Sequence, residues 1–216
     1  MANVTYDKNC LTVLDHPLVG HKMTILRDES TAPAHFRKLV HELAALEAYE
    51  ATRDLPTLQV RVKTPICETE GVRLKDDTLA VVPILRAGMG MLEGVLSVVP
   101  SAAVGVLGME RNEETHEPHS YYAKMPQGIE NRMVLVIDPM LATGGSALAA
   151  IKYLREAGVK DIRLLVMVAA PEGVAAVNAA ESDVHIWACA LDEGLNDAAY
   201  IVPGLGDAGD RIFGTV

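Results

Sequence analysis

Aromatic residues are scarce in this sequence, at 4% of 216 residues, although half of all residues are hydrophobic. The core is therefore expected to consist of Val, Leu, Ile and Ala, as in sheets that helices cover on both faces. A chain of this length suits one good-sized domain, so we expect residues 1–216 to form a single unit.

Positive charge is also in short supply, because 19 Lys and Arg stand against 29 Asp and Glu, giving a formal net charge of −10. This balance argues against nucleic acid or an anionic membrane as the main partner. It does not exclude an anionic small molecule as the ligand, since a few Arg side chains, Mg²⁺ and backbone N–H groups can oppose the overall negative field locally.

Cysteines and long apolar runs are few as well. Cys10, Cys67 and Cys189 lie far apart without a CxxC pair, which predicts free thiols in a reducing compartment. The longest apolar run, 164–170, is far too short to span a bilayer, and the first ten residues show no secretory signal. These absences predict a cytoplasmic protein with no membrane partner.

The N-terminal part of the chain predicts helices followed by a hairpin. Residues 16–53 have helical character, and Thr31 can cap a helix whose apolar positions recur every three or four residues. These positions are Phe36, Leu39, Val40, Leu43, Leu46 and Tyr49. Alternating residues then predict a strand at 58–63 that pairs with the segment up to residue 74. We expect this β-arm, 58–74, to serve in dimerisation.

From residue 78 onward, short apolar runs alternate with segments of helical length. The runs are 79–85, 102–109, 132–138, 161–170 and 183–191. This alternation indicates βαβ units and predicts an α/β fold with a doubly wound, mostly parallel sheet. Two segments break the rhythm: the polar connection 110–131 predicts a lid, and the glycine-rich tail 192–216 predicts tight turns that form a small hood.

The segment after the run 132–138 is longer than a simple strand-to-helix turn requires. The run ends at Asp138, Ser146 can cap the next helix, and Gly158 can end that helix. The loop between them therefore lies at the carboxyl edge of parallel strands, where open α/β sheets bind ligands.

The chemistry of this loop suits a sugar phosphate. Gly144 and Gly145 let backbone N–H groups approach an anion, Thr143 and Ser146 add hydroxyl donors, and the helix N-terminus adds partial positive charge. Asp138 would repel the phosphate unless it binds sugar hydroxyls, so the set indicates ribose 5-phosphate. A glycine pair chosen only for a tight turn is the alternative. The loop has neither the Lys and spacing of a P-loop nor the GxGxxG pattern.

The segment VIDPMLATGGSA, 136–147, resembles the phosphoribosyl-diphosphate loop of type I phosphoribosyltransferases, in the form of the uracil phosphoribosyltransferase family. Further similarity is carried by HPLVGHKMTILRD (16–28), YEAT (49–52), VPILRAGMGM (82–91), RNEET (111–115), VAAPEG (168–173) and YIVPGLGDAGDRIFGT (200–215). The last of these segments is specific to the uracil enzymes.

The resemblance implies transfer of the phosphoribosyl group from 5-phospho-α-D-ribose 1-diphosphate (PRPP) to uracil, giving UMP and diphosphate in pyrimidine salvage. Mg²⁺ is implied as a cofactor that PRPP carries, without direct protein ligands. The implied PRPP-binding loop comprises Asp138, Pro139, Met140, Leu141, Ala142, Thr143, Gly144, Gly145 and Ser146. We also expect a homo-oligomer, a dimer or a dimer of dimers; GTP as an activator, which only some members of the family use, stays open.

Two arginines are implied to hold the diphosphate. Arg86 follows the run 79–85, where a guanidinium can bind pyrophosphate bidentately; an arginine that simply reaches solvent is the alternative. Arg111 opens the polar connection, and its alternative is an exposed salt bridge to Glu113 or Glu114.

The sequence departs from the wider type I pattern at two points. Asp138 is followed by Pro139 where many members have a second acidic residue, so the ribose clamp rests on one carboxylate whose direction the rigid proline fixes. Glu110 stands where members often have an aromatic residue, which changes the charge beside Arg111.

The tail 200–215 is implied to recognise the base. Ile201 and the turn of Gly206, Asp207 and Ala208 are implied to face uracil with backbone groups, so that cytosine would leave buried groups unpaired at about 1–3 kcal/mol each. Asp207 is implied to lie near base and diphosphate and to contact Mg²⁺ through water.

The implied catalytic residues are thus Arg86, Asp138 and Asp207. No side chain is identified as the base that removes the uracil N1 proton. For Gly209 and Asp210 we prefer a structural role in a C-terminal turn.

Other functions remain as alternatives. A transferase for another base would share the loop but need a different tail. A regulator of pyrimidine metabolism with this fold, for example one that binds RNA, would show a basic face, which the composition does not supply. A diphosphokinase that makes PRPP would need an ATP site, for which no motif is present. The HxxH pair His116 and His119 lies in a polar loop without a second ligand pair and does not predict a metal site.

Overall fold

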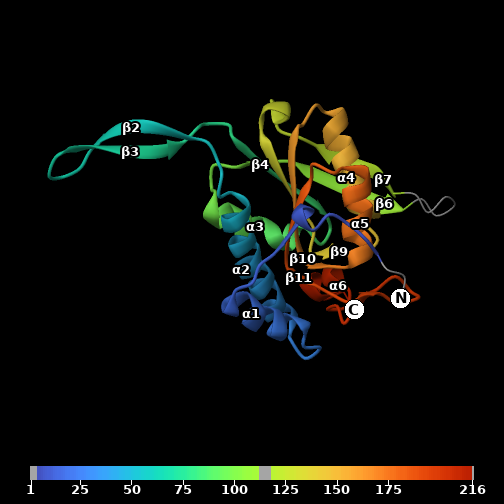
Figure 1. Cartoon of the computed structure of the whole chain (residues 1–216). Coiled ribbons are helices and arrows are strands. Elements are labelled where there is room, and N and C mark those ends of the chain that lie inside the picture. Colours follow the sequence, from blue (N-terminus) through green and yellow to red (C-terminus); the bar gives the residue numbers. More distant parts are fainter. Residues whose placement is uncertain (1–3, 112–117, 216) are drawn as a thin grey trace.

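The computed structural model describes residues 4–111 and 118–215, and side chains within 4–109 and 121–215. The chain folds around a central sheet (Figure 1). Its strand order is β1-β11-β10-β8-β4-β6-β7. Within the described residues, each neighbouring pair along this path is parallel apart from β6 and β7, which are antiparallel. The predicted α/β fold with a mostly parallel sheet is confirmed.

The strands of this sheet are β1 (Leu11–Val13), β4 (Leu79–Leu85), β5 (Ala103–Val104), β6 (Val106–Arg111), β7 (Pro118–Lys124), β8 (Met133–Ile137), β9 (Met140–Leu141), β10 (Asp161–Ala169) and β11 (His185–Leu191). The α-helices are α1 (Pro17–Arg27), α2 (Pro33–Ala51), α3 (Met89–Val98), α4 (Gly145–Glu156), α5 (Pro171–Ala180) and α6 (Ala208–Phe213). Short 3-10 helices are η1 (Lys8–Cys10) and η2 (Ile129–Asn131). The described helices include none long and apolar enough to cross a bilayer.

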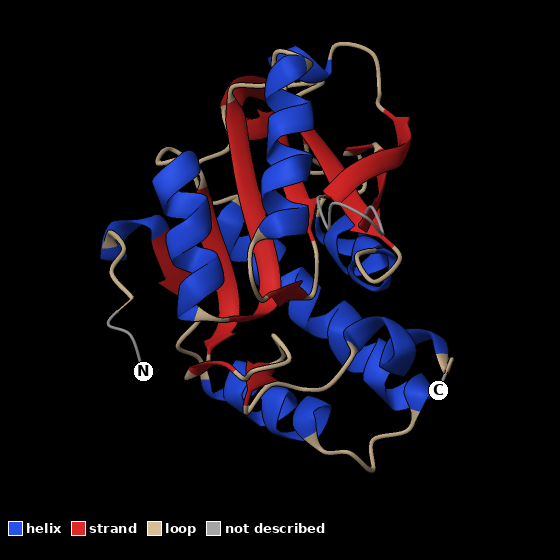
Figure 2. Cartoon of the chain, turned by 90° about the vertical axis from the view of Figure 1, so that its right-hand side faces the viewer, coloured by secondary structure: helices blue, strands red, loops and turns tan. Residues whose placement is uncertain are grey.

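Helices cover both faces of the sheet because its central strands are apolar on both sides (Figure 2). β8 is buried along its whole length, and its alternate residues enter different cores. Leu135 belongs to the core that α1, α2, α3 and α6 share, whereas Val136 belongs to the core beneath α4 and α5. Each such buried side chain contributes about 1.5–3 kcal/mol. The sheet is therefore doubly wound, as predicted.

The predicted N-terminal helical region consists of two helices, and its expected cap is wrong. α2 begins at Pro33 with Ala32 in the N-cap position, because a proline in the first turn has no N–H that needs a partner. The Thr31 hydroxyl instead donates to Ile25 O at 2.6 Å. Gly158 was predicted to end the helix that follows the loop after Asp138. It follows α4 with φ +87°, so this prediction is confirmed.

The expected apolar face of α2 is correct except near its end. Phe36, Leu39, Val40 and Leu43 are buried and Leu46 is partly buried, all on the face toward the sheet. Tyr49 is 63% exposed, and that expectation is wrong. The last turns bury Glu47, Ala48 and Ala51 instead, so the buried stripe passes to one side of Tyr49.

A hairpin projects from the body of the molecule (Figure 1). β2 (Thr57–Lys63) and β3 (Glu68–Leu74) pair in antiparallel register. Leu58, Ile66 and Val72 are exposed on it. An isolated two-stranded hairpin is only marginally stable in water. The expectation that this arm serves in dimerisation stays a prediction.

The polar connection 110–131 is partly a strand, because β7 occupies 118–124 and pairs with β6. Tyr121 and Tyr122 are adjacent, and tyrosine is enriched in strands. Because β7 occupies part of it, the irregular connection is shorter than the sequence suggested. Outside the described part lie residues 112–117, with Glu113, Glu114 and His116, and the side chains of Glu110, Arg111 and His119. The lid role stays a prediction.

The three cysteines are free, as predicted. Cys10 and Cys189 are buried and Cys67 is exposed on the hairpin.

Candidate active site

The carboxyl ends of β4 and β8 and the tail meet around a pocket of about 260 Å³, here called the edge pocket. Its lining comes from three parts of the chain: Ala87 after β4; Asp138, Met140 and Ala142 after β8; and Ala199, Tyr200, Ile201, Gly206, Asp207, Ala208 and Gly209 from the tail. The structure therefore brings the predicted ribose carboxylate together with the predicted base-recognition residues.

The loop after β8 is held against β10 by its backbone. Asp138 N–H donates to Leu165 O at 3.2 Å, and Pro139 O accepts from the N–H groups of Met167 and Val168, both at 3.1 Å. The short β9 then pairs with the end of β10. These bonds fix the direction in which the Asp138 side chain leaves the sheet.

The start of α4 depends on a glycine. Gly144 is the N-cap residue with φ +86°, and a Cβ there would lie 3.2 Å from Ala176 Cβ and 3.3 Å from Gly173 O. Both the conformation and the space therefore favour glycine. Ser146 lies inside the first turn, so the prediction that it caps α4 is wrong. With no side-chain cap bound to α4, the first N–H groups of this helix are available to an anion.

Asp138 as a whole residue is half-buried, and its carboxyl group has few partners. Burial raises its pKa to about 7, opposed by a hydrogen bond from Met140 N–H at 3.4 Å. Hydroxyl donors from a sugar would stabilise the ionised form and so offset the cost of burial. The site thus has an acceptor whose hydrogen-bonding capacity is largely unused.

Arg86 follows β4 and extends toward the tail. Its side chain is 60% exposed, its Nη2 lies 3.3 Å from Asp210 Oδ1, and its guanidinium is 5.7 Å from the Phe213 ring. An exposed pair of this length is weak, so the guanidinium remains available to a phosphate group. The peptide bond between Leu85 and Arg86 is cis.

Asp210 has a partner that the sequence-based interpretation missed. Its Oδ1 accepts a hydrogen bond from Arg86 Nη2 at 3.3 Å. Its own N–H donates to Asp207 Oδ1 at 2.9 Å, so Asp207 is the N-cap residue of α6. The signal was present in the sequence, since a capping aspartate three residues before another acidic residue is typical of a helix start.

Gly88 is another site residue without an earlier prediction. A Cβ on Gly88 would collide with Ile137 O and lie 2.7 Å from both Ile84 N and Ile84 O. The chain after Arg86 therefore crosses directly over the ends of β4 and β8. The Ala-Gly that follows Arg86 in the sequence was the available signal.

Two carboxylates, Asp138 and Asp207, line the edge pocket from different segments. Among the described side chains, no three His, Cys, Asp or Glu gather as ligands for a metal ion. This donor set fits Mg²⁺ bound mainly by the phosphates of a substrate. That Mg²⁺ acts here stays a prediction.

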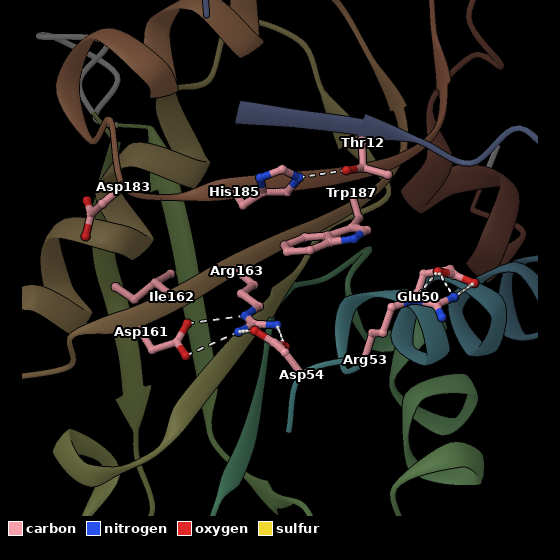
Figure 3. Close-up of a pocket in the computed structure, with 10 residues that line it drawn as sticks. All are labelled: Thr12, Glu50, Arg53, Asp54, Asp161, Ile162, Arg163, Asp183, His185 and Trp187. Atoms are coloured by element: carbon pink, nitrogen blue, oxygen red, sulfur yellow. Dashed lines mark hydrogen bonds and ion pairs between the residues drawn. The ribbon is translucent and has the colours of Figure 1, made fainter. Parts of the chain in front are cut away.

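A larger pocket, of about 580 Å³, lies at the amino ends of β10 and β11 (Figure 3). Its charged groups are already paired: Arg163 donates to Asp54 at 2.6 and 2.9 Å. His185 Nε2 lies 2.8 Å from Thr12 Oγ1. This amino-edge pocket contains none of the predicted site residues.

Comparisons with known proteins agree with the geometry. The family model for uracil phosphoribosyltransferase matches residues 13–215. A uracil phosphoribosyltransferase of Lacticaseibacillus paracasei is 55% identical over 94% of this chain and 98% of its own length. That of Symbiobacterium thermophilum is 54% identical over 95% of this chain and 98% of its own length.

Solved structures agree with these relatives. The structure of a protein from Aquifex aeolicus is 40% identical, with a TM-score of 0.89 over 94% of this chain and 97% of that chain. The adenine phosphoribosyltransferase of Trypanosoma brucei, at 11% identity and a TM-score of 0.60 over 93% of this chain and 90% of its own, shares the fold alone. The chain belongs to the uracil phosphoribosyltransferase family.

Proposed function

We propose that this chain transfers the 5-phosphoribosyl group of PRPP to uracil, giving UMP and diphosphate. The observation that carries the proposal is the edge pocket, where the Asp138 loop and the tail turn Gly206 to Ala208 line one cavity. At about 260 Å³ the cavity is near the small end of ligand sites, which run from about 300 Å³ upward. It suits a single-ring base beside a ribose.

The loop holds the ribose 5-phosphate. N–H groups at the start of α4 and the hydroxyls of Thr143 and Ser146 bind the 5-phosphate, and the positive end of the helix dipole favours it. Asp138 accepts hydrogen bonds from the ribose hydroxyls. With both ends of the sugar fixed, its anomeric carbon faces the base pocket in a reactive orientation.

The diphosphate leaves toward Arg86 and Arg111. Arg86 exchanges its weak contact with Asp210 for the departing phosphates, and this electrostatic stabilisation grows as negative charge develops. Mg²⁺ bound to PRPP would neutralise further charge on the leaving group, and Asp207 would contact it through water. No protein side chain is assigned as the base for uracil N1.

Uracil is selected by backbone groups of Ile201 and of Gly206, Asp207 and Ala208. Uracil presents an acceptor, a donor and another acceptor in a row, and the turn offers complementary N–H and C=O groups. Cytosine inverts two of these groups, which would leave buried groups unpaired at about 1–3 kcal/mol each.

We also propose that the chain acts in the cytoplasm, in pyrimidine salvage, as a homo-oligomer built through the arm β2–β3. Exposed apolar residues on an otherwise unsupported hairpin favour a protein partner. GTP as an activator belongs to the same set of expectations, and a titration of activity with GTP tests it.

The decisive experiment measures uracil-dependent release of diphosphate from PRPP, with and without Mg²⁺. We expect release with uracil and none with adenine, hypoxanthine or orotate. Turnover with another base but not with uracil would overturn the proposal, and PRPP binding without turnover of any base would indicate a regulator.

A further inference from the structure

An ion pair outside the edge pocket holds the base-recognition turn. Arg27 is the last residue of α1, and Asp192 follows β11. Their side chains form two hydrogen bonds, with N–O distances of 2.8 and 2.5 Å. The Asp192 side chain is 4% exposed and that of Arg27 is 24% exposed, so the pair is largely withdrawn from water.

Both members of this pair bind the same residue of the tail, Gly204, one through its N–H and the other through its C=O. Asp192 Oδ2 accepts from Gly204 N–H at 2.8 Å, and Arg27 Nη1 donates to Gly204 O at 2.6 Å. Gly204 has φ +63°, and a Cβ on it would collide with Ile201 O. The ion pair therefore fixes the point at which the chain folds back onto Ile201.

The next carbonyl is held in a similar way. Arg211 Nη1 donates to Leu205 O at 2.8 Å and its Nη2 donates to Asp28 O at 2.5 Å, while its guanidinium lies 4.4 Å from the Phe36 ring. The backbone between Ile201 and the pocket-lining Gly206 is thus bound to the end of α1 and the residue after it.

We propose that Arg27 and Asp192 are positioning residues that set uracil affinity and selectivity through the backbone of the tail. The inference rests on the proposed function, because it assumes that uracil lies in the edge pocket. Charge-assisted hydrogen bonds are the stronger kind, and removal of one member of a buried pair leaves its partner uncompensated. Because the base is read by backbone atoms, its recognition depends on how firmly that backbone is held.

The test compares Arg27→Met and Asp192→Asn with the parent protein in steady-state kinetics. We expect the KM for uracil to rise about 10–100-fold, as small misplacements of a binding group do. The KM for PRPP should stay within about twofold, because no hydrogen bond or ion pair among the described residues joins the loop 138–146 to this pair. Discrimination of uracil against cytosine should weaken as well. Arg27→Lys keeps the charge but not the paired donors. Its KM for uracil should therefore lie between those of the parent protein and Arg27→Met.

Arg155→Met is the matched control. Arg155 is also 24% exposed, and it also binds carboxylates, those of Glu181 and Asp183, together with the carbonyls of Val159 and Lys160. It lies at the C-terminal end of α4, away from the edge pocket. We expect this variant to lower Tm while the KM for uracil remains unchanged.

The outcomes separate the two proposals. If the parent protein releases no diphosphate with uracil, the proposed function fails and the inference fails with it. If the parent is active and Arg27→Met retains its KM for uracil, or Arg155→Met raises that KM equally, the inference alone is overturned. Should Arg27→Met not fold, the near-isosteric Asp192→Asn decides by the same criterion.

Discussion

The two edges of the parallel sheet carry pockets of different size and opposite chemistry. At the amino edge, the pocket of about 580 Å³ is lined by charged groups that are already engaged in ion pairs, such as Arg163 and Asp54. At the carboxyl edge, the pocket of about 260 Å³ has a desolvated carboxyl at Asp138 and a weakly engaged guanidinium at Arg86 nearby. The candidate active site is therefore distinguished by polar side chains that lack strong partners, and not by being the larger of the two pockets.

The largest expected effect comes from Gly88→Ala at the carboxyl edge. The added methyl group would collide with Ile137 O, which is backbone and has no room to move without displacing the ends of β4 and β8. We expect turnover to fall by about 1,000-fold or more, because Arg86 and Asp138 both follow these strand ends. Diphosphate release in a steady-state assay measures this loss.

Gly20→Ala in α1 is the control, since nothing lies within 4 Å of its added methyl group. Alanine should stabilise this helix by about 0.5–1 kcal/mol and leave turnover unchanged. Normal kinetics in Gly88→Ala would show that the crossing over β4 and β8 is not needed by the site.

Asp138→Asn should reduce turnover by about 100–1,000-fold, because the amide cannot replace a carboxylate that accepts two hydroxyl donors. In the parent protein, kcat/KM for PRPP should fall as the pH falls through about 7, where Asp138 gains its proton. The variant should lack this acid limb. Kinetics and pH dependence like those of the parent would remove Asp138 from the ribose clamp.

The Asp138→Asn variant should lose turnover but gain thermal stability. The pKa of Asp138 is raised in the folded protein above its unfolded value, so its ionised form disfavours folding above about pH 7. Asp138→Asn should therefore have the higher Tm at pH 8. The difference should shrink as the pH falls from about 7 toward the unfolded value of about 4. Calorimetry over this range measures it.

Ala208→Leu should weaken binding of the base without weakening binding of the sugar donor. Ala208 is buried and lines the edge pocket, so three extra carbon atoms would occupy the space proposed for uracil. We expect the KM for uracil to rise about tenfold or more while PRPP still binds. Ala180→Leu, at the exposed end of α5, is the control. Unchanged uracil affinity in Ala208→Leu would make the assignment of the tail wrong.

The smallest effect is expected at the amino edge. The hydrogen bonds from Arg163 lower the pKa of Asp54, so its charged form stabilises the fold and this contribution disappears as the pH falls through the lowered value. Asp54→Asn should cost at most about 1 kcal/mol at pH 7, because the carboxylate is largely exposed. Activity should not change. Loss of turnover in this variant would mean that the two edges are coupled.

Local patterns predicted the framework of the site. The apolar run before Asp138 and the paired glycines after it placed a loop at the carboxyl edge, because strand, loop and helix follow one another in the chain. The same patterns misassigned the cap of α4, since a serine near a helix start resembles a cap while the left-handed Gly144 takes that position.

Long-range pairs were beyond the reach of these patterns. Arg27 and Asp192 are 165 residues apart, and neither lies in a periodic segment that would relate them. Arg86 and Asp210 are similarly distant, at 124 residues. Such partners are determined by how the tail folds back across α1 and the sheet, and no local preference encodes that path.

The proposed recognition of uracil by main-chain atoms constrains how the protein can change. Exchanging the side chain of Ile201 or Ala208 for one other than proline keeps the main-chain N–H and C=O groups, so it adds or removes bulk without altering the order of donors and acceptors. Acceptance of a different base would require the turn to adopt a new path, and that requires new anchors beneath it. Variation in ligand preference among such proteins should therefore be sought in the scaffold that faces away from the ligand.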